Sequence, residues 1–207
     1  MTDTPHPQGA PSDALDTASA EAEPAPVASA AIDKPVVLIG LMGVGKSTVG
    51  RRLAAIMGRD FVDADDAIED AAQRKISEIF EEFGEAYFRD GERRVIARLM
   101  EENQGVIATG GGAFVDPETR ALILEKGIAV WIDCDIDTLV ERTSRRNTRP
   151  LLKTGDPREI LTRLMNERGP LYAEAPVRVQ SDKGPHADTA RAILRGIETY
   201  LTGQNPS

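Results

Sequence analysis

A glycine-rich segment that ends in a lysine and two hydroxyl residues, Gly40 to Thr48 (GLMGVGKST), carries the strongest chemical signal in this sequence. It lies between an apolar run and a stretch with helical periodicity, which is the context that the phosphate-binding pattern GxxxxGK(S/T) requires. Its glycines let successive backbone N–H groups converge on an anion. Lys46 supplies a compact cation for the β- and γ-phosphates, and Ser47 offers a hydroxyl to Mg²⁺. The segment therefore predicts a nucleotide-binding site.

Two aspartates lie two residues apart at the end of the next expected strand, 61–63. An extended backbone points the side chains of Asp63 and Asp65 to the same side. One carboxylate can then hold a water molecule on the metal while the other accepts a hydrogen bond from a substrate hydroxyl. Capping of the following helix is the structural alternative for this pair.

Two arginines have the chemistry needed to bind a small acid. Arg89 lies on a long amphipathic segment, and Glu92, three residues further on, has the spacing to orient its guanidinium. Arg168 precedes Gly169-Pro170, a pair that is expected to end a helix and to aim the arginine side chain. A guanidinium binds a carboxylate in a bidentate geometry that lysine cannot reproduce. A solvated helix surface is the alternative for both arginines.

Two further segments suit an enzyme that transfers phosphate. Gly110-Gly111-Gly112 follows an apolar run and allows a ligand to approach the backbone closely; the alternative is a bare turn. The arginine-rich stretch 142–152 predicts a mobile lid, at about residues 145–155, that closes over ATP and supplies an arginine to the transition state. A basic surface loop is the alternative for this stretch.

These residues need a scaffold that brings them together. Strands alternate with helices, which predicts an α/β protein with a parallel sheet whose ligand crevice lies at the carboxyl ends of the strands. Val49, Leu53 and Ile56 are expected to share the buried face of the first helix. Ser77 is expected to cap a later helix, which Gly84 ends. Asp116 and Asp156, each followed by a proline, are expected to cap the helices that start at 117 and 157. The expected strands are 36–39, 61–63, 105–108, 128–133 and 177–180, and the expected helices are 47–57, 65–73, 78–83, 85–103, one that starts at 117, 137–144, 157–168 and 187–201.

The 207 residues suit one domain with a tail. Residues 1–33 contain six of the 34 acidic residues, five prolines and nine alanines, but no lysine, arginine or aromatic residue. Because such a segment buries too little apolar surface to offset its ordering entropy, we expect 1–33 to be disordered and the domain to span 34–204. The tail resembles neither a secretory signal nor a transit peptide.

Composition and motifs exclude several classes of protein. A net charge of −9 argues against a nucleic-acid-binding surface, and no apolar run approaches the ~20 residues that span a bilayer. The single cysteine, Cys134, excludes a disulfide framework, and His6 and His186 lack partners for a histidine metal site. The chain contains no NKxD sequence, which argues against a GTPase, and the domain after the tail is too small for a typical ATPase motor. Asp133 imitates a metal-binding aspartate at a strand end, but helix capping explains it better.

Six segments, in this order along the chain, resemble the patterns of the shikimate kinases, and the resemblance covers about residues 34–180. They are GLMGVGKST, the DAD at 63–65, FGEAYFRDGE around Arg89, ATGGGA around Gly111, RPLL at 149–152 and ERGPLY around Arg168. The resemblance implies a P-loop NTPase fold with a five-stranded parallel sheet flanked by helices, a substrate-binding helical segment and a mobile lid.

The resemblance also implies an activity. The enzyme would phosphorylate the 3-hydroxyl of shikimate with ATP and Mg²⁺, on the route to chorismate and the aromatic amino acids, as a cytoplasmic monomer without nucleic-acid or membrane partners. By the same resemblance, Asp65 contacts the reacting hydroxyl as general base or orienting group. Arg89 and Arg168 hold the carboxylate of shikimate beside Gly111. The other implied roles are ATP binding by Gly43, Val44, Gly45, Lys46, Ser47 and Thr48, Mg²⁺ binding by Ser47 and, through water, Asp63, and nucleotide contact by Arg149; the adenine contacts near 181–185 stay open.

Two other functions share part of this pattern. A gluconate or nucleoside-monophosphate kinase has the same phosphate loop, and gluconate also offers a carboxylate and hydroxyls. A non-catalytic nucleotide-binding regulator would keep the fold without transferring phosphate. The intact set of charged and hydroxyl residues argues against this regulator; its members are Lys46, Ser47, Asp63, Asp65 and Arg89.

Overall fold

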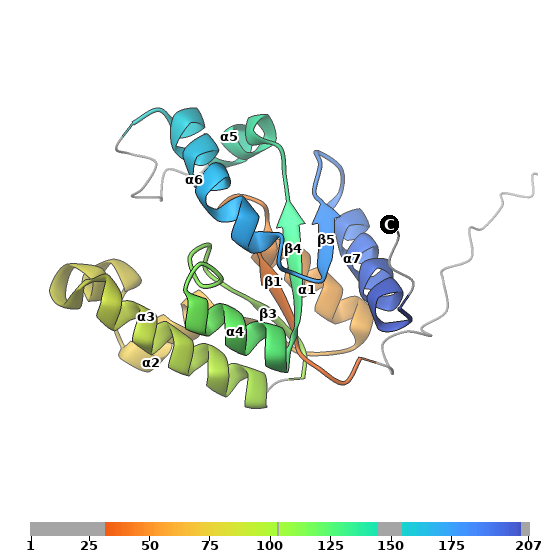
Figure 1. Ribbon diagram of the computed structural model, residues 1–207, viewed down its shortest axis with the longest axis horizontal. Helices are drawn as coiled ribbons and strands as arrows, with labels where there is room; N and C mark the ends of the chain where they lie inside the picture. Colours follow the sequence, from red (N-terminus) through yellow and green to blue (C-terminus); the bar gives the residue numbers. More distant parts are fainter. Residues whose placement is uncertain (1–31, 103, 145–154, 204–207) are drawn as a thin grey trace, which may run out of the picture.

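Five parallel strands form one sheet at the centre of the protein (Figure 1). The computed structural model describes residues 32–102, 104–144 and 155–203. The strand order is β2-β3-β1-β4-β5, and the register places Val36 of β1 beside Val106 on one side and Ile128 on the other. The strands are β1 (Val36–Ile39), β2 (Phe61–Asp63), β3 (Val106–Ala108), β4 (Ile128–Asp133) and β5 (Val177–Gln180). The predicted α/β fold and all five strands are confirmed, to within one residue at each end.

The central strands are apolar because both of their faces are covered. Every residue of β1, β3 and β4 is buried, as expected for a parallel sheet with helices on both sides. The edge strand β5 instead alternates between buried and exposed residues. The helices are α1 (Lys46–Met57), α2 (Ala64–Ala72), α3 (Ile76–Glu102), α4 (Pro117–Lys126), α5 (Ile136–Ser144), α6 (Pro157–Tyr172) and α7 (His186–Leu201).

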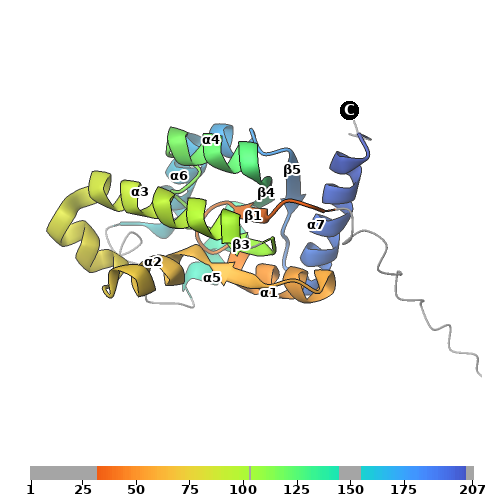
Figure 2. The same cartoon turned by 90° about the horizontal axis from the view of Figure 1, so that it is seen from below.

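The helices form layers on the two sides of the sheet. Figure 2 shows α4 on one face and α1 on the other, and α1 also packs against α7. The buried face of α1 contains Val49 and Leu53, as predicted, together with Ala54 and Met57. Ile56 is 42% exposed, so its assignment to the buried face was wrong. The apolar stripe of α1 is therefore rotated toward Met57, which the simple spacing rule does not detect.

Helix α3 consists of two helical segments that meet at a kink at Gly84, as the sequence predicts. Gly84 does interrupt the helical geometry, with φ 80° and ψ 175°, but the helix resumes directly after it. The predicted cap at Ser77 is wrong, since the helix begins at Ile76. The backbone N–H of Ile76 donates to Glu69 Oε1 at 3.0 Å, so a carboxylate from α2 satisfies the start of α3.

Helix α6 continues through the pair Gly169-Pro170, which the sequence analysis expected to end it. The missing N–H of Pro170 is tolerated because the proline lies in the last turn, where the N–H of Ala173 still donates to the oxygen of Gly169 at 2.9 Å. The helix therefore carries both Arg168 and Tyr172, one turn apart, on one continuous element.

The first described residue, Ile32, belongs to the core although its neighbours in sequence resemble a polar tail. It is 1% exposed, and Arg59 donates to its carbonyl oxygen. The composition of 1–33 as a whole does not reveal this buried isoleucine. Because Ile32 lies in the core, the folded domain begins before residue 34. Among the residues that the structure describes, no helix has the length and apolar character needed to cross a membrane.

Candidate active site

The phosphate loop connects the carboxyl end of β1 to the start of α1. Three of its glycines have positive φ: Gly40 at 135°, Gly43 at 89° and Gly45 at 95°. A Cβ at Gly40 would lie 2.5 Å from the carbonyl oxygen of Ile132, so the loop needs glycine there for both conformation and space. The Lys46 ammonium donates to the carbonyl oxygens of Gly40 and Leu41 at 2.8 and 3.0 Å, which places its charge at the mouth of the loop.

Asp63 caps a helix, which is the structural alternative that the sequence left open, and it also contacts the phosphate loop. Its Oδ1 accepts from the backbone N–H of Asp65 at 3.2 Å and so caps α2. Its Oδ2 accepts from the Ser47 hydroxyl at 2.6 Å. A hydroxyl oxygen and a carboxylate oxygen thus lie side by side at the phosphate loop, and this oxygen donor set suits the preference of Mg²⁺ for oxygen ligands.

Asp65 lies on the first turn of α2, facing the triple-glycine loop that follows β3. A Cβ at Gly110 would come within 2.8 Å of Asp65 Oδ1, so the carboxylate fits closely against glycine backbone. Burial raises the pKa of Asp65, the neighbouring charge of Asp63 raises it further, and Lys46 partly offsets both effects. A carboxylate whose charge is disfavoured in this way is a suitable proton acceptor.

Arg89 projects from α3 and is held by two glutamates. Its Nη1 donates to Glu92 Oε2 at 2.5 Å, and its Nε and Nη2 donate to Glu85 Oε1 at 3.3 and 3.2 Å. Glu92 is 1% exposed, and burial raises its pKa, while the carboxylates raise the pKa of Arg89 despite its own burial. The predicted orientation of Arg89 by Glu92 is confirmed, and a Cβ at Gly112 would collide with the Arg89 guanidinium.

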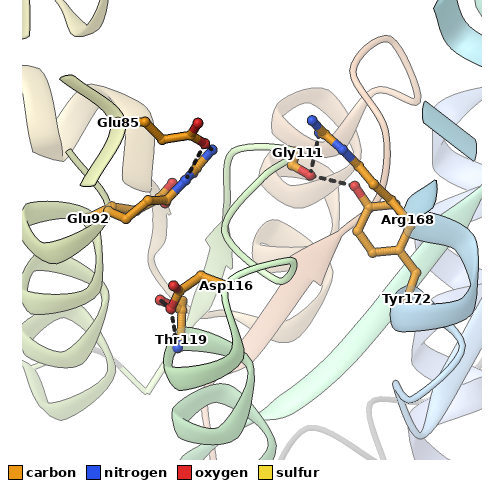
Figure 3. Close-up of polar contacts among 8 residues, drawn as sticks. Glu85, Glu92, Gly111, Asp116, Thr119, Arg168 and Tyr172 are labelled. Carbon is orange, nitrogen blue, oxygen red and sulfur yellow. Dashed lines mark hydrogen bonds and ion pairs between the residues drawn. The ribbon is translucent and has the colours of Figure 1, made fainter. Parts of the chain in front are cut away.

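Arg168 reaches the same loop from α6, on the opposite side (Figure 3). Its Nη1 donates to the carbonyl oxygen of Gly111 at 3.0 Å, and the Tyr172 hydroxyl donates to the same oxygen at 2.5 Å. The loop then enters α4, where Asp116 accepts from the Thr119 N–H at 2.8 Å, as its predicted capping role requires. The glycines Gly110, Gly111 and Gly112 therefore each lie against a different charged side chain, Asp65, Arg168 and Arg89.

Two contacts at the phosphate loop were not found by the sequence analysis. Arg142, part of the arginine-rich stretch, donates to the Val44 carbonyl at 3.3 Å and to the Ser181 hydroxyl at 3.2 Å, and so connects the loop to the segment after β5. The His186 ring also packs on the loop: a Cβ at Gly45 would lie 3.3 Å from His186 Cε1. Both contacts join residues far apart in the chain, so no local sequence pattern predicts them.

Two other side chains are clearly structural. The sequence predicted that Asp133 caps a helix, and this prediction is wrong. Its Oδ2 accepts from Arg178 at 2.6 Å, and at the start of α5 it is Asp135 that accepts from the N–H of Thr138. Burial raises the pKa of the Cys134 thiol to about 11, which keeps it protonated and unreactive. Arg149 and the lid residues 145–154 lie outside the described part of the chain, as do residues 1–31.

The strand order, the phosphate loop and the charged groups around the triple-glycine loop define a P-loop kinase. The family model for shikimate kinase matches residues 42–198, and the chain belongs to the shikimate kinase family. As a kinase it uses ATP as its co-substrate.

Individual relatives agree with this assignment. The shikimate kinase of Novosphingobium aromaticivorans is 62% identical over 174 residues, which is 82% of this chain and 90% of the relative. A solved structure of the shikimate kinase from Acinetobacter baumannii in complex with shikimate is 35% identical, with a TM-score of 0.76 over 86% of this chain and 99% of that one. A gluconokinase structure from Sinorhizobium meliloti, at 18% identity and a TM-score of 0.54, shares the fold alone; it covers 84% of this chain and 99% of that one.

Proposed function

We propose that this chain transfers the terminal phosphoryl group of ATP to the 3-hydroxyl of shikimate, giving ADP and shikimate 3-phosphate. The observation that carries this proposal is the convergence of one partly buried carboxylate and two arginines on the triple-glycine loop, beside the phosphate loop. Asp65, Arg89 and Arg168 come from α2, α3 and α6, and each touches a different glycine. This arrangement suits a small acceptor that has both a carboxylate and a hydroxyl.

The phosphate loop binds the nucleotide. Backbone N–H groups of 43–48 surround the phosphates at the N-terminus of α1, and Lys46 neutralises the β- and γ-phosphates. Ser47 and, through water, Asp63 would hold Mg²⁺, which when bound neutralises charge on the transferring phosphoryl group. Arg149, outside the described residues, is proposed to reach the nucleotide from the lid.

Arg89 and Arg168 approach the triple-glycine loop from opposite sides and are proposed to bind the carboxylate of the acceptor in bidentate fashion. This fixes the ring so that its 3-hydroxyl faces Asp65. As the oxygen of that hydroxyl bonds to the γ-phosphorus, the bond from this phosphorus to the β-γ bridging oxygen breaks and ADP leaves. The hydroxyl proton passes to Asp65, whose raised pKa favours accepting it. We also propose that the enzyme acts as a monomer, as the family resemblance implies.

The test is a comparison of acceptors with the purified full chain. ATP and Mg²⁺ are supplied with shikimate, gluconate or a nucleoside monophosphate, and ADP release is followed. Of the three acceptors, we expect only shikimate to be phosphorylated, and we expect no turnover in a Lys46→Met variant. Equal or faster turnover with gluconate would overturn the substrate assignment. Tight ATP binding without transfer to any acceptor would favour the non-catalytic regulator.

A further inference from the structure

The carbonyl oxygen of Gly111 accepts two hydrogen bonds from the same helix. The Tyr172 hydroxyl donates at 2.5 Å and Arg168 Nη1 donates at 3.0 Å, and both donors lie on α6, four residues apart (Figure 3). A carbonyl oxygen has two lone pairs, so the two donors fill its capacity. Two hydrogen bonds, and not one, therefore hold the Gly111 carbonyl to α6.

The two donors differ in their freedom to move. Tyr172 is fully buried, at 0% exposed, and its ring packs near that of Trp131, with 6.0 Å between the centroids. Burial also raises the pKa of Tyr172, so its hydroxyl keeps the proton that it donates. Arg168 is only partly buried, and its long side chain can change rotamer. Of the two hydrogen bonds to Gly111, the one from Arg168 is the one that can be exchanged.

A bound carboxylate competes for the Arg168 guanidinium. A charge-assisted bond to a carboxylate is about twice as strong as a bond to a neutral carbonyl, so the substrate draws the guanidinium away from Gly111. A partly buried carbonyl left without a donor would resist this exchange. The phenol of Tyr172 removes that resistance, because it remains on the oxygen after Arg168 has turned.

We propose that Tyr172 is a positioning residue that holds the Gly111 carbonyl and thereby frees Arg168 to bind the carboxylate of the substrate. This inference rests on the proposed function, in which Arg168 binds that carboxylate. Because Gly110 and Gly112 flank Gly111 and lie against Asp65 and Arg89, the same hydrogen bond also fixes the loop that spaces the other two site residues.

The test is a double-mutant cycle read by calorimetric binding of shikimate to the full chain. Tyr172→Phe keeps the buried ring and removes only the donor. We expect it to weaken shikimate binding about tenfold while ATP affinity stays within about twofold. In an Arg168→Ala background, where no guanidinium has to leave Gly111, the same change should cost less than about twofold. Tyr200→Phe, at an exposed position on α7, is the matched control and should bind like the wild type.

The outcomes separate this inference from the function on which it rests. Weaker shikimate binding in Arg168→Ala but unchanged binding in Tyr172→Phe would overturn the inference and leave the proposed function intact. Unchanged binding in Arg168→Ala would remove Arg168 from the substrate site and overturn both assignments. Equal effects of Tyr172→Phe in the two backgrounds, or loss of the fold, would show that the hydroxyl serves the structure and not Arg168, and would also overturn the inference.

Discussion

Alanine substitutions in the triple-glycine loop test whether the loop positions the charged groups of the site. A Cβ at Gly112 would have three atoms of the Arg89 guanidinium as its nearest neighbours, all closer than van der Waals contact allows. The backbone of Gly112 lacks the positive φ that would strain an alanine, so the contact itself must be relieved. Glu92 is buried and paired with the guanidinium, which limits its room, so the guanidinium has to shift by about 1 Å to restore van der Waals contact with the new Cβ.

The expected rise in KM for Gly112→Ala follows from the hydrogen bond that this shift breaks, which is the one proposed between the Arg89 guanidinium and the carboxylate of shikimate. A hydrogen bond to a charged group contributes ~1.5–3 kcal/mol, which corresponds to about a 10- to 150-fold rise in KM for shikimate. The KM for ATP should not change, because the phosphate loop is not disturbed. Gly110→Ala should instead lower kcat, since its Cβ would lie 2.8 Å from Asp65 Oδ1.

Steady-state kinetics with both substrates varied provide the measurement. Gly91→Ala is the matched control, since it lies on α3 two residues from Arg89 and a Cβ there would meet nothing within 4 Å. A Gly112→Ala enzyme with the wild-type KM for shikimate would refute the reasoning, because it would show that the position of Arg89 does not matter for the acceptor.

Three other predictions concern the base, the core and the tail. Asp65→Asn should lower kcat by ~10²-fold or more with ATP affinity near the wild type. Burial raises the pKa of Asp65, so the folded state favours the protonated carboxyl, and this contribution to stability is lost as the pH rises through the folded-state pKa. Asp65→Asn should therefore raise the Tm at neutral pH and raise it less at acid pH. Asp66→Asn, on the exposed side of α2, should not raise the Tm. Gly50→Ala should lower the free energy of unfolding by ~1–3 kcal/mol in urea titrations, since its Cβ would lie 2.5 Å from the Phe61 ring; an unchanged midpoint would contradict this. Deleting 1–31 should leave kcat and both KM values within about twofold, and a large loss of activity would make the tail part of the enzyme.

The sequence predicted best those features that local physics determines. The phosphate loop needs glycine conformations, a lysine and a hydroxyl within nine consecutive residues, so its pattern is readable without a fold. Asp116 and Asp156 cap their helices as expected, because capping depends on a side chain and an N–H two or three residues away. Local sequence patterns mispredict this structure where a contact from a distant element replaces the local rule. Glu69 of α2, and not Ser77, satisfies the start of α3, and α6 passes through Pro170.

By itself, the sequence determined which groups this protein has for phosphate transfer and that they follow the strands of a parallel sheet. Only the tertiary structure decided which of them touch. That Gly110, Gly111 and Gly112 face Asp65, Arg168 and Arg89, and that Tyr172 and Arg168 share one carbonyl oxygen, follows from how α2, α3 and α6 pack around one loop. Such contacts depend on the relative positions of elements far apart in the chain, and residue spacing along the chain does not encode those positions directly.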